Sequence, residues 1–162
     1  MNKYPFDPVF DENSELLILG SFPSVKSRET EFFYGHKQNR FWKVLSMVFE
    51  CTEPVTIEEK KAFLHENGIA LWDVIESCDI SGSSDSSIRN VVPTDLHKVL
   101  DRAPHIDRIF VNGRTAEKYY LKYMKDIDIP MMCLPSTSPA NAAWNIERLY
   151  GEWKKIKDDI QI

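Results

Sequence analysis

The chain has 162 residues, of which 43% are hydrophobic and 12% aromatic. This length and apolar content are enough for one hydrophobic core but too small for two domains of ordinary size, so we expect a single domain over residues 1–162. The net charge of -5 argues against a general nucleic-acid-binding surface, because contacts between basic side chains and phosphates normally dominate such affinity. Cys51, Cys78 and Cys133 lie far apart and form no C-x-x-C pair. We therefore expect reduced core thiols, with no metal and no cofactor.

Neither a membrane span nor a targeting signal is visible in the sequence. No segment approaches the ~20 apolar residues that a spanning helix needs, and the first twenty residues lack the basic region and apolar run of a signal peptide. We expect a cytoplasmic, soluble monomer. Residues 20–45 carry five basic and two acidic side chains, whereas most of the acidic residues lie elsewhere. Any contact with nucleic acid should therefore be local.

The first half of the chain alternates between predicted strands and helices. An apolar run over residues 15–20 ends in glycine and is typical of a central parallel strand that is buried on both faces. Helical patterns follow over residues 41–49 and over residues 57–66, where carboxylates occupy the first turn. Residues 68–74 form a second apolar run and predict the second strand.

The second half of the chain continues this alternation. It predicts a helix, a strand, a helix and a strand over residues 94–102, 106–111, 115–124 and 130–134. Thr94 is the expected N-cap of the first of these helices. A last helix begins near Ala142 and places five apolar side chains at spacings of three and four: Ile146, Leu149, Trp153, Ile156 and Ile160.

This order of elements predicts an α/β fold, a three-layer α/β/α sandwich with a central four-stranded parallel sheet. Right-handed crossovers between parallel strands place helices on both faces of such a sheet. Ligands bind at the carboxyl ends of the strands. The functional site should therefore lie where the segments that follow the strands meet: residues 20–24, 76–90, 112–113 and 135–141. Within the second of these, residues 81–87 are rich in serine and predict a polar loop.

Three segments combine polar side chains with aromatic rings or a tight backbone. Residues 20–24 read G-S-F-P-S and form a tight exit from the first strand. Residues 34–42 read Y-G-H-K-Q-N-R-F-W and offer aromatic faces on which a base can stack. Residues 134–141 read L-P-S-T-S-P-A-N, with small side chains and hydroxyls that suit close approach to a phosphodiester. None of the three is a metal, phosphate-loop or nucleophile-elbow motif.

In this order the three segments resemble the motifs of the uracil-DNA glycosylase superfamily, and most of all its hypoxanthine-DNA glycosylase branch, family six. The resemblance extends from Leu16 to about Trp153. It implies a monofunctional glycosylase of base excision repair that acts on double-stranded DNA. Such an enzyme flips a deaminated base, hypoxanthine before uracil, out of the duplex and hydrolyses its N-glycosidic bond. The absence of cysteine ligands separates this chain from the iron–sulfur branches.

The resemblance also implies roles for individual residues. Other branches have Asp or Asn at the position of Phe22 to orient the attacking water, and Phe22 cannot do so. The matching catalytic candidates are Asn112 and Asn39. The base-binding candidates are Tyr34, as the stacking ring, with Phe22, Ser21 and Asp73. The DNA-binding candidates are Ser136, Ser138, Pro139, Ala140, His36 and Lys37.

Asparagine suits this chemistry. Cleavage of an N-glycosidic bond passes through an oxocarbenium-like sugar, so the site must place a water and stabilise the departing base. An asparagine has no useful basicity, but its carbonyl oxygen accepts from the water while its NH₂ group donates to a base or a phosphate. A deaminated purine needs an acceptor for its N1–H and a donor for O6. Lys37 is the only lysine in the motif segments and is interpreted as a phosphate contact, so the product should be an intact abasic site.

Each assignment has a structural alternative. Asn112 precedes a glycine, and an Asn-Gly pair at the end of a strand is typical of a turn. Asn39 has the alternative role of capping a helix that starts at Arg40. Tyr34 has the alternative of a surface loop aromatic, but three adjacent aromatic residues, 32–34, exceed what solvent-facing loops usually carry. His36 fits a phosphate contact and an ordinary loop histidine equally well. For Asp73 the alternative role is hydrogen bonding to the turn after the second strand. At the level of function, the alternatives are a uracil or mismatch glycosylase of the same superfamily and a non-catalytic nucleotide- or nucleic-acid-binding module.

Overall fold

The computed structural model describes residues 2–3, 7–23, 32–82 and 84–157. Its centre is a parallel sheet of four strands in the order β3-β2-β6-β7. These strands are β2 (Leu16–Gly20), β3 (Ile69–Asp73), β6 (Arg108–Asn112) and β7 (Met131–Leu134). All four predicted strands are thus confirmed, together with the α/β class and the parallel sheet.

The apolar runs form strands because the sheet is covered on both faces. Every residue of β2 and of β3 is buried, which leaves no position for a solvent-facing polar side chain. Leu16 pairs with Ile69 on one side and with Arg108 on the other, and this register brings the carboxyl ends of the strands to the same edge. The sequence positions after these strands therefore meet in space.

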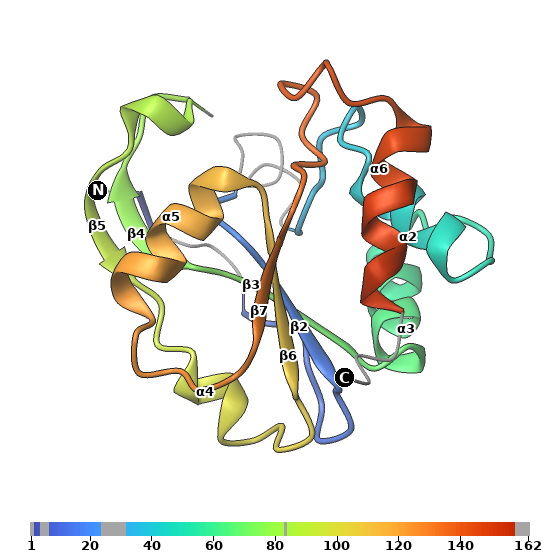
Figure 1. Ribbon diagram of the computed structural model, residues 1–162, viewed down its shortest axis with the longest axis horizontal. Helices are drawn as coiled ribbons and strands as arrows, with labels where there is room; N and C mark the ends of the chain where they lie inside the picture. Colours follow the sequence, from blue (N-terminus) through green and yellow to red (C-terminus); the bar gives the residue numbers. More distant parts are fainter. Residues whose placement is uncertain (1, 4–6, 24–31, 83, 158–162) are drawn as a thin grey trace.

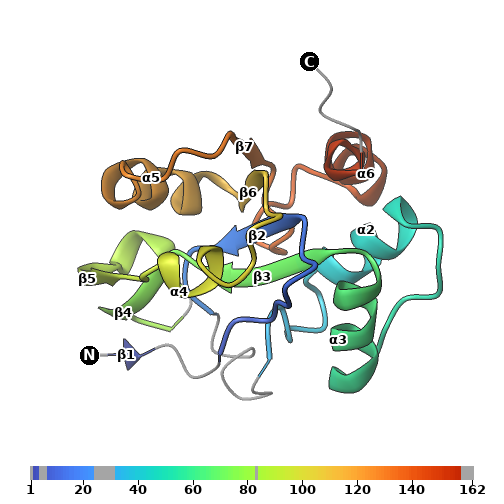
Figure 2. The same cartoon turned by 90° about the horizontal axis from the view of Figure 1, so that it is seen from below.

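Helices cover both faces of the sheet, as Figures 1 and 2 show. On one side lie α2 (Phe41–Val48), α3 (Ile57–Glu66) and α6 (Ile146–Trp153), which a short 3₁₀ turn, η2 (Lys154–Ile156), follows. On the other side lie α5 (Arg114–Tyr123) and the short α4 (His97–Leu100). The predicted three-layer sandwich is therefore present.

A second, antiparallel sheet was not predicted. It consists of β1 (Asn2–Lys3), β4 (Ile75–Asp79) and β5 (Arg89–Pro93) in the order β1-β4-β5. The segment 76–90, in which residues 81–87 were expected to form a polar loop, thus contains most of a hairpin and the 3₁₀ turn η1 (Asp85–Ser87). Only Val74 separates β4 from β3, so the two strands appear in the sequence as one run.

Two predicted helix ends were wrong. Thr94 does not cap a helix: its N–H donates to the Val74 carbonyl at 2.8 Å and extends the β4–β5 pairing at the end opposite the turn. The helix that follows spans four residues, and the Asp95 carboxylate accepts from the His97 N–H at 3.1 Å at its start. The last helix begins at Ile146 rather than near Ala142, because the Asn145 side chain caps it by accepting from the Arg148 N–H at 2.9 Å. Ile160 lies outside the described residues.

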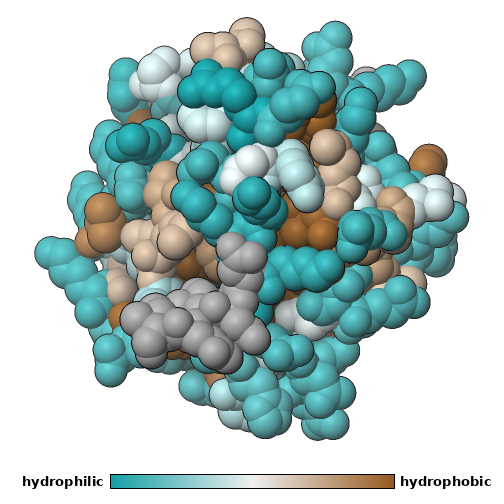
Figure 3. All heavy atoms as spheres, turned by 45° about the vertical axis from the view of Figure 1, so that its right-hand side comes forward, coloured by the Kyte–Doolittle hydropathy of each residue, from teal (hydrophilic) through white to brown (hydrophobic). Residues whose placement is uncertain are grey.

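The surface matches a protein with one buried core. Hydrophilic side chains cover most of the face in Figure 3, and apolar side chains show only as separate patches.

Cys78 is buried, but Cys51 is exposed and Cys133 half-buried, so the expectation that all three are core thiols was wrong. No helix among the described residues has both the length and the apolar character that a membrane crossing requires.

Candidate active site

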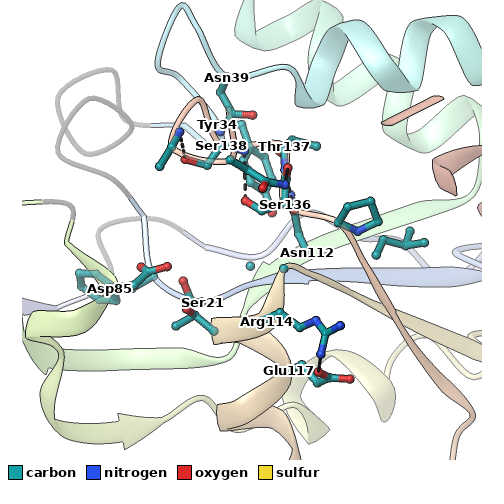
Figure 4. A pocket seen from close by; sticks show the side chains of 18 of the residues that line it. Ser21, Tyr34, Asn39, Asp85, Asn112, Arg114, Glu117, Ser136, Thr137 and Ser138 are labelled. Carbon is teal, nitrogen blue, oxygen red and sulfur yellow. Dashed lines mark hydrogen bonds and ion pairs between the residues drawn. The ribbon is translucent and has the colours of Figure 1, made fainter. Parts of the chain in front are cut away.

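An open cavity of about 1050 Å³ lies at the carboxyl ends of the parallel strands. Four residues that follow or end these strands line it: Gly20, Asp73, Asn112 and Pro135. In Figure 4, Ser21 and Asp85 lie on one side of the opening, across from Asn39 and the loop that carries Ser136, Thr137 and Ser138. The cavity therefore gathers segments from four distant parts of the sequence.

Asn112 ends β6 with its side chain held on two sides by one residue. Its Oδ1 accepts from the Thr137 backbone N–H at 3.1 Å, and its Nδ2 donates to the Thr137 hydroxyl at 3.0 Å. Gly113 follows with φ +97°, and a Cβ atom there would lie 3.0 Å from the Ser136 Cβ. This glycine therefore lets the second motif segment pass close to the end of β6.

Asn39 reaches the same cavity from the start of α2. Its Oδ1 accepts from the Phe41 N–H at 2.9 Å, so the side chain bonds to the first N–H of the helix. The helix begins at Phe41, one residue later than the capping alternative assumed, and the N-cap position is Arg40. Among the described residues the Asn39 NH₂ group has no hydrogen-bond partner. Capping and a role in the cavity are therefore compatible for this residue.

Tyr34 forms part of the cavity wall. Its ring stacks on Phe41 with ring centroids 3.9 Å apart and planes 19° apart, so one face of the ring is already covered. The residue has φ +54°, a left-handed backbone conformation that is uncommon for a tyrosine. Its hydroxyl is buried. Burial raises the pKa of Tyr34, the charge of Asp73 raises it further, and the Asn112 side chain partly offsets both, so the phenol stays neutral.

The Asp73 carboxylate and the Tyr34 hydroxyl lie against the backbone of Gly20. A Cβ atom on Gly20 would approach Asp73 Oδ1 to 2.3 Å and the Tyr34 hydroxyl to 2.9 Å. Only glycine fits at the end of β2 without moving one of these two groups. Asp73 is 4% exposed, so a carboxylate and a phenol form the deep end of the cavity.

The loop after β7 is held in place by one arginine. The guanidinium of Arg40 donates to the carbonyls of Ser138 at 2.8 Å and Asn141 at 3.2 Å, and also to the carbonyl of Trp144. The Arg40 backbone N–H donates to the Thr137 carbonyl at 3.1 Å. This one side chain therefore ties the start of α2 to most of the loop that the sequence marked as its second motif.

The serine hydroxyls of this loop are used locally. Ser136 Oγ accepts from the Ser138 N–H and Ser138 Oγ accepts from the Ala140 N–H, both at 3.1 Å. Asn141 Nδ2 donates to the Ser136 carbonyl at 3.0 Å. A hydroxyl that accepts still has its own proton to donate, so both serines retain a donor for an incoming phosphate.

The remaining predicted residues divide into two groups. Ser21, Phe22 and Ala140 line the cavity, whereas Pro139, His36 and Lys37 lie outside its lining. His36 Nδ1 accepts from the Gln38 N–H at 3.0 Å, as in an ordinary loop turn. Several lining residues had not been singled out from the sequence, among them Asp85, Arg114, Thr137 and Trp144. Thr137 lay inside a recognised motif, whereas Asp85 lay in the segment predicted as a polar loop.

No group of three histidine, cysteine or carboxylate side chains suited to a metal occurs among residues 2–3, 7–23, 32–82 and 84–157. The groups that line the cavity are mostly amides, hydroxyls and aromatic rings, with carboxylates at Asp73, Asp85, Glu117 and Glu152. Arg114 is the one cation among the lining residues, and its side chain is 93% exposed. The amide and hydroxyl dipoles of these lining residues therefore suit the binding of a polar, planar group.

The fold and the cavity define an α/β sandwich with a polar, aromatic-walled site at the carboxyl ends of its strands. The chain belongs to the Uracil DNA glycosylase superfamily, whose sequence model matches residues 8–158. It is 34% identical over 157 residues to a hypoxanthine DNA glycosylase of Methanosarcina acetivorans, covering 96% of this chain and 98% of that protein.

Two further relatives agree with this assignment. A hypoxanthine DNA glycosylase of Methanosarcina barkeri is 34% identical over 120 residues, which cover 74% of this chain and 76% of the relative. The solution NMR structure of a candidate uracil DNA glycosylase from Methanosarcina acetivorans superposes with a TM-score of 0.83 at 33% identity. That alignment covers 96% of each chain, so the likeness extends over the whole fold.

Proposed function

We propose that the chain is a monofunctional DNA glycosylase that removes hypoxanthine from double-stranded DNA in base excision repair. The observation that carries this proposal is that two asparagine amides, Asn112 and Asn39, line one cavity with part of each amide already fixed by backbone hydrogen bonds. The names of the two Methanosarcina relatives support the choice of hypoxanthine.

The two amides suit a hydrolysis that needs a positioned water more than a strong base. The bond between the sugar C1′ and the base nitrogen breaks with its electron pair going to the base. The water oxygen then bonds to C1′ and loses a proton, which the departing base anion takes up in the overall hydrolysis. Asn112 Oδ1 and Asn39 Oδ1 each accept one backbone N–H and retain a second lone pair. A carbonyl oxygen held in this way needs no reorganisation when the reaction occurs, which is the condition for transition-state stabilisation.

The deep end of the cavity suits a deaminated purine. Tyr34 has one ring face on Phe41, so a flipped base stacks on the other face, beside Phe22 and Ser21. Asp73 lines the cavity, and its carboxylate has lone pairs that can accept from the N1–H of hypoxanthine, the role that this proposal gives it. Adenine has no hydrogen at N1, so its N1 acceptor would face the carboxylate acceptor, and this contact would reject adenine.

The loop after β7 supplies the contacts with the DNA backbone in this proposal. The Ser136 and Ser138 hydroxyls and the backbone at Pro139 and Ala140 face a phosphodiester, and Lys37 and His36 contact phosphates from the neighbouring segment.

A panel of labelled duplexes with hypoxanthine, uracil or xanthine opposite each normal base tests the proposal. Single-turnover rates with excess purified protein should be highest for hypoxanthine. Strands should break only after alkali, because no lysine lines the cavity among the described residues and an amine nucleophile is needed for a lyase step.

Three results of the same panel would contradict the proposal. Faster release of uracil than of hypoxanthine would favour the uracil or mismatch glycosylase. Binding of every duplex without release of any base, by folded protein, would favour the non-catalytic module. Nicking before alkali that disappears in Lys37→Ala would show a bifunctional enzyme.

A further inference from the structure

Thr137 is a fully buried residue that contacts the Asn112 amide through two of its own groups. It is 0% exposed and lies in the loop after β7, which Figure 4 shows above the end of β6. Its N–H donates to Asn112 Oδ1 at 3.1 Å, and its hydroxyl accepts from Asn112 Nδ2 at 3.0 Å. Because Thr137 is 0% exposed, its hydroxyl and N–H are used by Asn112 and are not open to solvent, although the residue belongs to the cavity lining.

These two bonds determine which way the Asn112 amide faces. A backbone N–H can only donate, so the atom opposite the Thr137 nitrogen must be the amide oxygen, and the NH₂ group must face the hydroxyl. A flipped amide would bring two donors together at the backbone nitrogen. The two bonds to Thr137 therefore hold both the amide oxygen and the NH₂ group in fixed positions.

Thr137 also connects the two asparagines that the proposed function requires. Its carbonyl accepts from the Arg40 N–H at 3.1 Å, and Arg40 directly follows Asn39. The end of β6 and the start of α2 are thus joined through the backbone and side chain of one residue. A shift of Thr137 moves Asn112 relative to Asn39.

We infer that Thr137 is a positioning residue that orients the Asn112 amide for the reaction. This inference rests on the proposed function for its catalytic consequence, but not for the orientation itself. Because Thr137 acts through the Asn112 amide in this inference, loss of its hydroxyl should lower the rate of the chemical step and leave the binding of DNA unchanged.

Thr137→Val and Thr137→Ser separate the hydroxyl from the volume of the side chain. Valine has nearly the same shape and keeps the backbone N–H but leaves Asn112 Nδ2 without its acceptor, whereas serine retains the acceptor. We expect Thr137→Val to lower the single-turnover rate on hypoxanthine by about 10- to 100-fold, with an unchanged dissociation constant for DNA, and Thr137→Ser to stay within about threefold of the unaltered chain. If Thr137→Val does not fold, Thr137→Ala takes its place.

A double variant and a spectroscopic measurement distinguish positioning from a general structural role. In the Asn112→Ala background Thr137→Val should cause little further slowing, because the group that it positions is gone. An equal slowing in both backgrounds, or full activity of folded Thr137→Val, would overturn the inference. The ¹⁵N NMR signal of the Asn112 side-chain amide should shift in Thr137→Val but much less in Thr137→Ser. An unshifted signal overturns the inference even if the chain cleaves no base.

Discussion

The side chain of Asn112 makes a hydrogen bond that supports the fold and also has a proposed role in the reaction. Its amide holds the buried N–H of Thr137, which has no exposed surface and cannot turn to water for an acceptor. The turn-forming alternative and the catalytic assignment therefore make different predictions about the same substitution. The first concerns the free energy of unfolding, and the second concerns the rate of the chemical step.

We predict that Asn112→Ala lowers the single-turnover rate on hypoxanthine by ~10²-fold or more with little change in DNA affinity. The same change should lower the free energy of unfolding by about 1–3 kcal/mol, because Thr137 loses its acceptor. Urea denaturation and rates per folded molecule measure the two effects separately.

Asn112→Asp provides a second measurement. A carboxylate can still accept from the Thr137 N–H, but it cannot donate and it places a negative charge near the departing base anion, so activity should remain low. Full activity of folded Asn112→Ala would move the catalytic assignment to Asn39. Full activity of both single alanine variants would end the assignment to asparagine.

At the scale of the elements, the parallel sheet was predictable and the small antiparallel sheet was not. The strands β2 and β3 are buried on both faces, so the sequence shows them as continuous apolar runs. The strand β5 has the sequence R-N-V-V-P and no fully buried residue, which leaves no periodic signal to detect. The position of the cavity followed from the rule that ligands bind at the carboxyl ends of parallel strands.

The pairings inside the site could not be predicted. Asn112 and Thr137 are 25 residues apart, and nothing in either local sequence shows that their side chains meet. Arg40 likewise bonds with carbonyls about 100 residues away, at Ser138, Asn141 and Trp144. Such contacts depend on how the loops cross above the sheet, which neither local propensity nor periodicity determines.

We predict that Arg40→Met loosens the loop after β7. Removing a charged donor from several loop carbonyls should lower the free energy of unfolding by about 2 kcal/mol and weaken DNA binding. Arg40→Lys should be intermediate, because a single ammonium cannot reproduce the forked geometry of the guanidinium. Hydrogen exchange of the amides of Asn141 and Trp144, which bond within this loop, reports the local effect.

Lys43→Met is the matched control, since it removes an exposed cation from the same helix. It should leave the exchange of both loop amides unchanged. Equal exchange rates in Arg40→Met and in the unaltered chain would show that the loop holds its shape without the arginine.

For the whole molecule, a net charge of -5 must be reconciled with a polyanionic partner. Contacts with phosphates release counterions, so the number of such contacts can be measured from the dependence of affinity on salt. Arg114 lines the cavity, and the guanidinium of Arg148 lies 3.9 Å from the ring centroid of Trp144, which also lines it. Lys37 is the third candidate phosphate contact, from the neighbouring motif segment. Arg40 is bonded to carbonyls, and Lys26 and Arg28 lie outside the described residues.

This arrangement predicts a shallow dependence of DNA affinity on salt. With about three phosphate contacts, the slope of log K against log salt concentration should be about -3, which is far less steep than for a protein with an extended basic surface. Lys37→Ala and Arg114→Ala should each reduce the steepness by about 1, whereas Lys122→Ala, near the far end of α5, should have no effect. Fluorescence anisotropy with an abasic duplex between about 50 and 200 mM salt measures these slopes. If neither Lys37→Ala nor Arg114→Ala changes the slope, the protein binds DNA through another surface. The flipped base would then have to enter the cavity from a different direction.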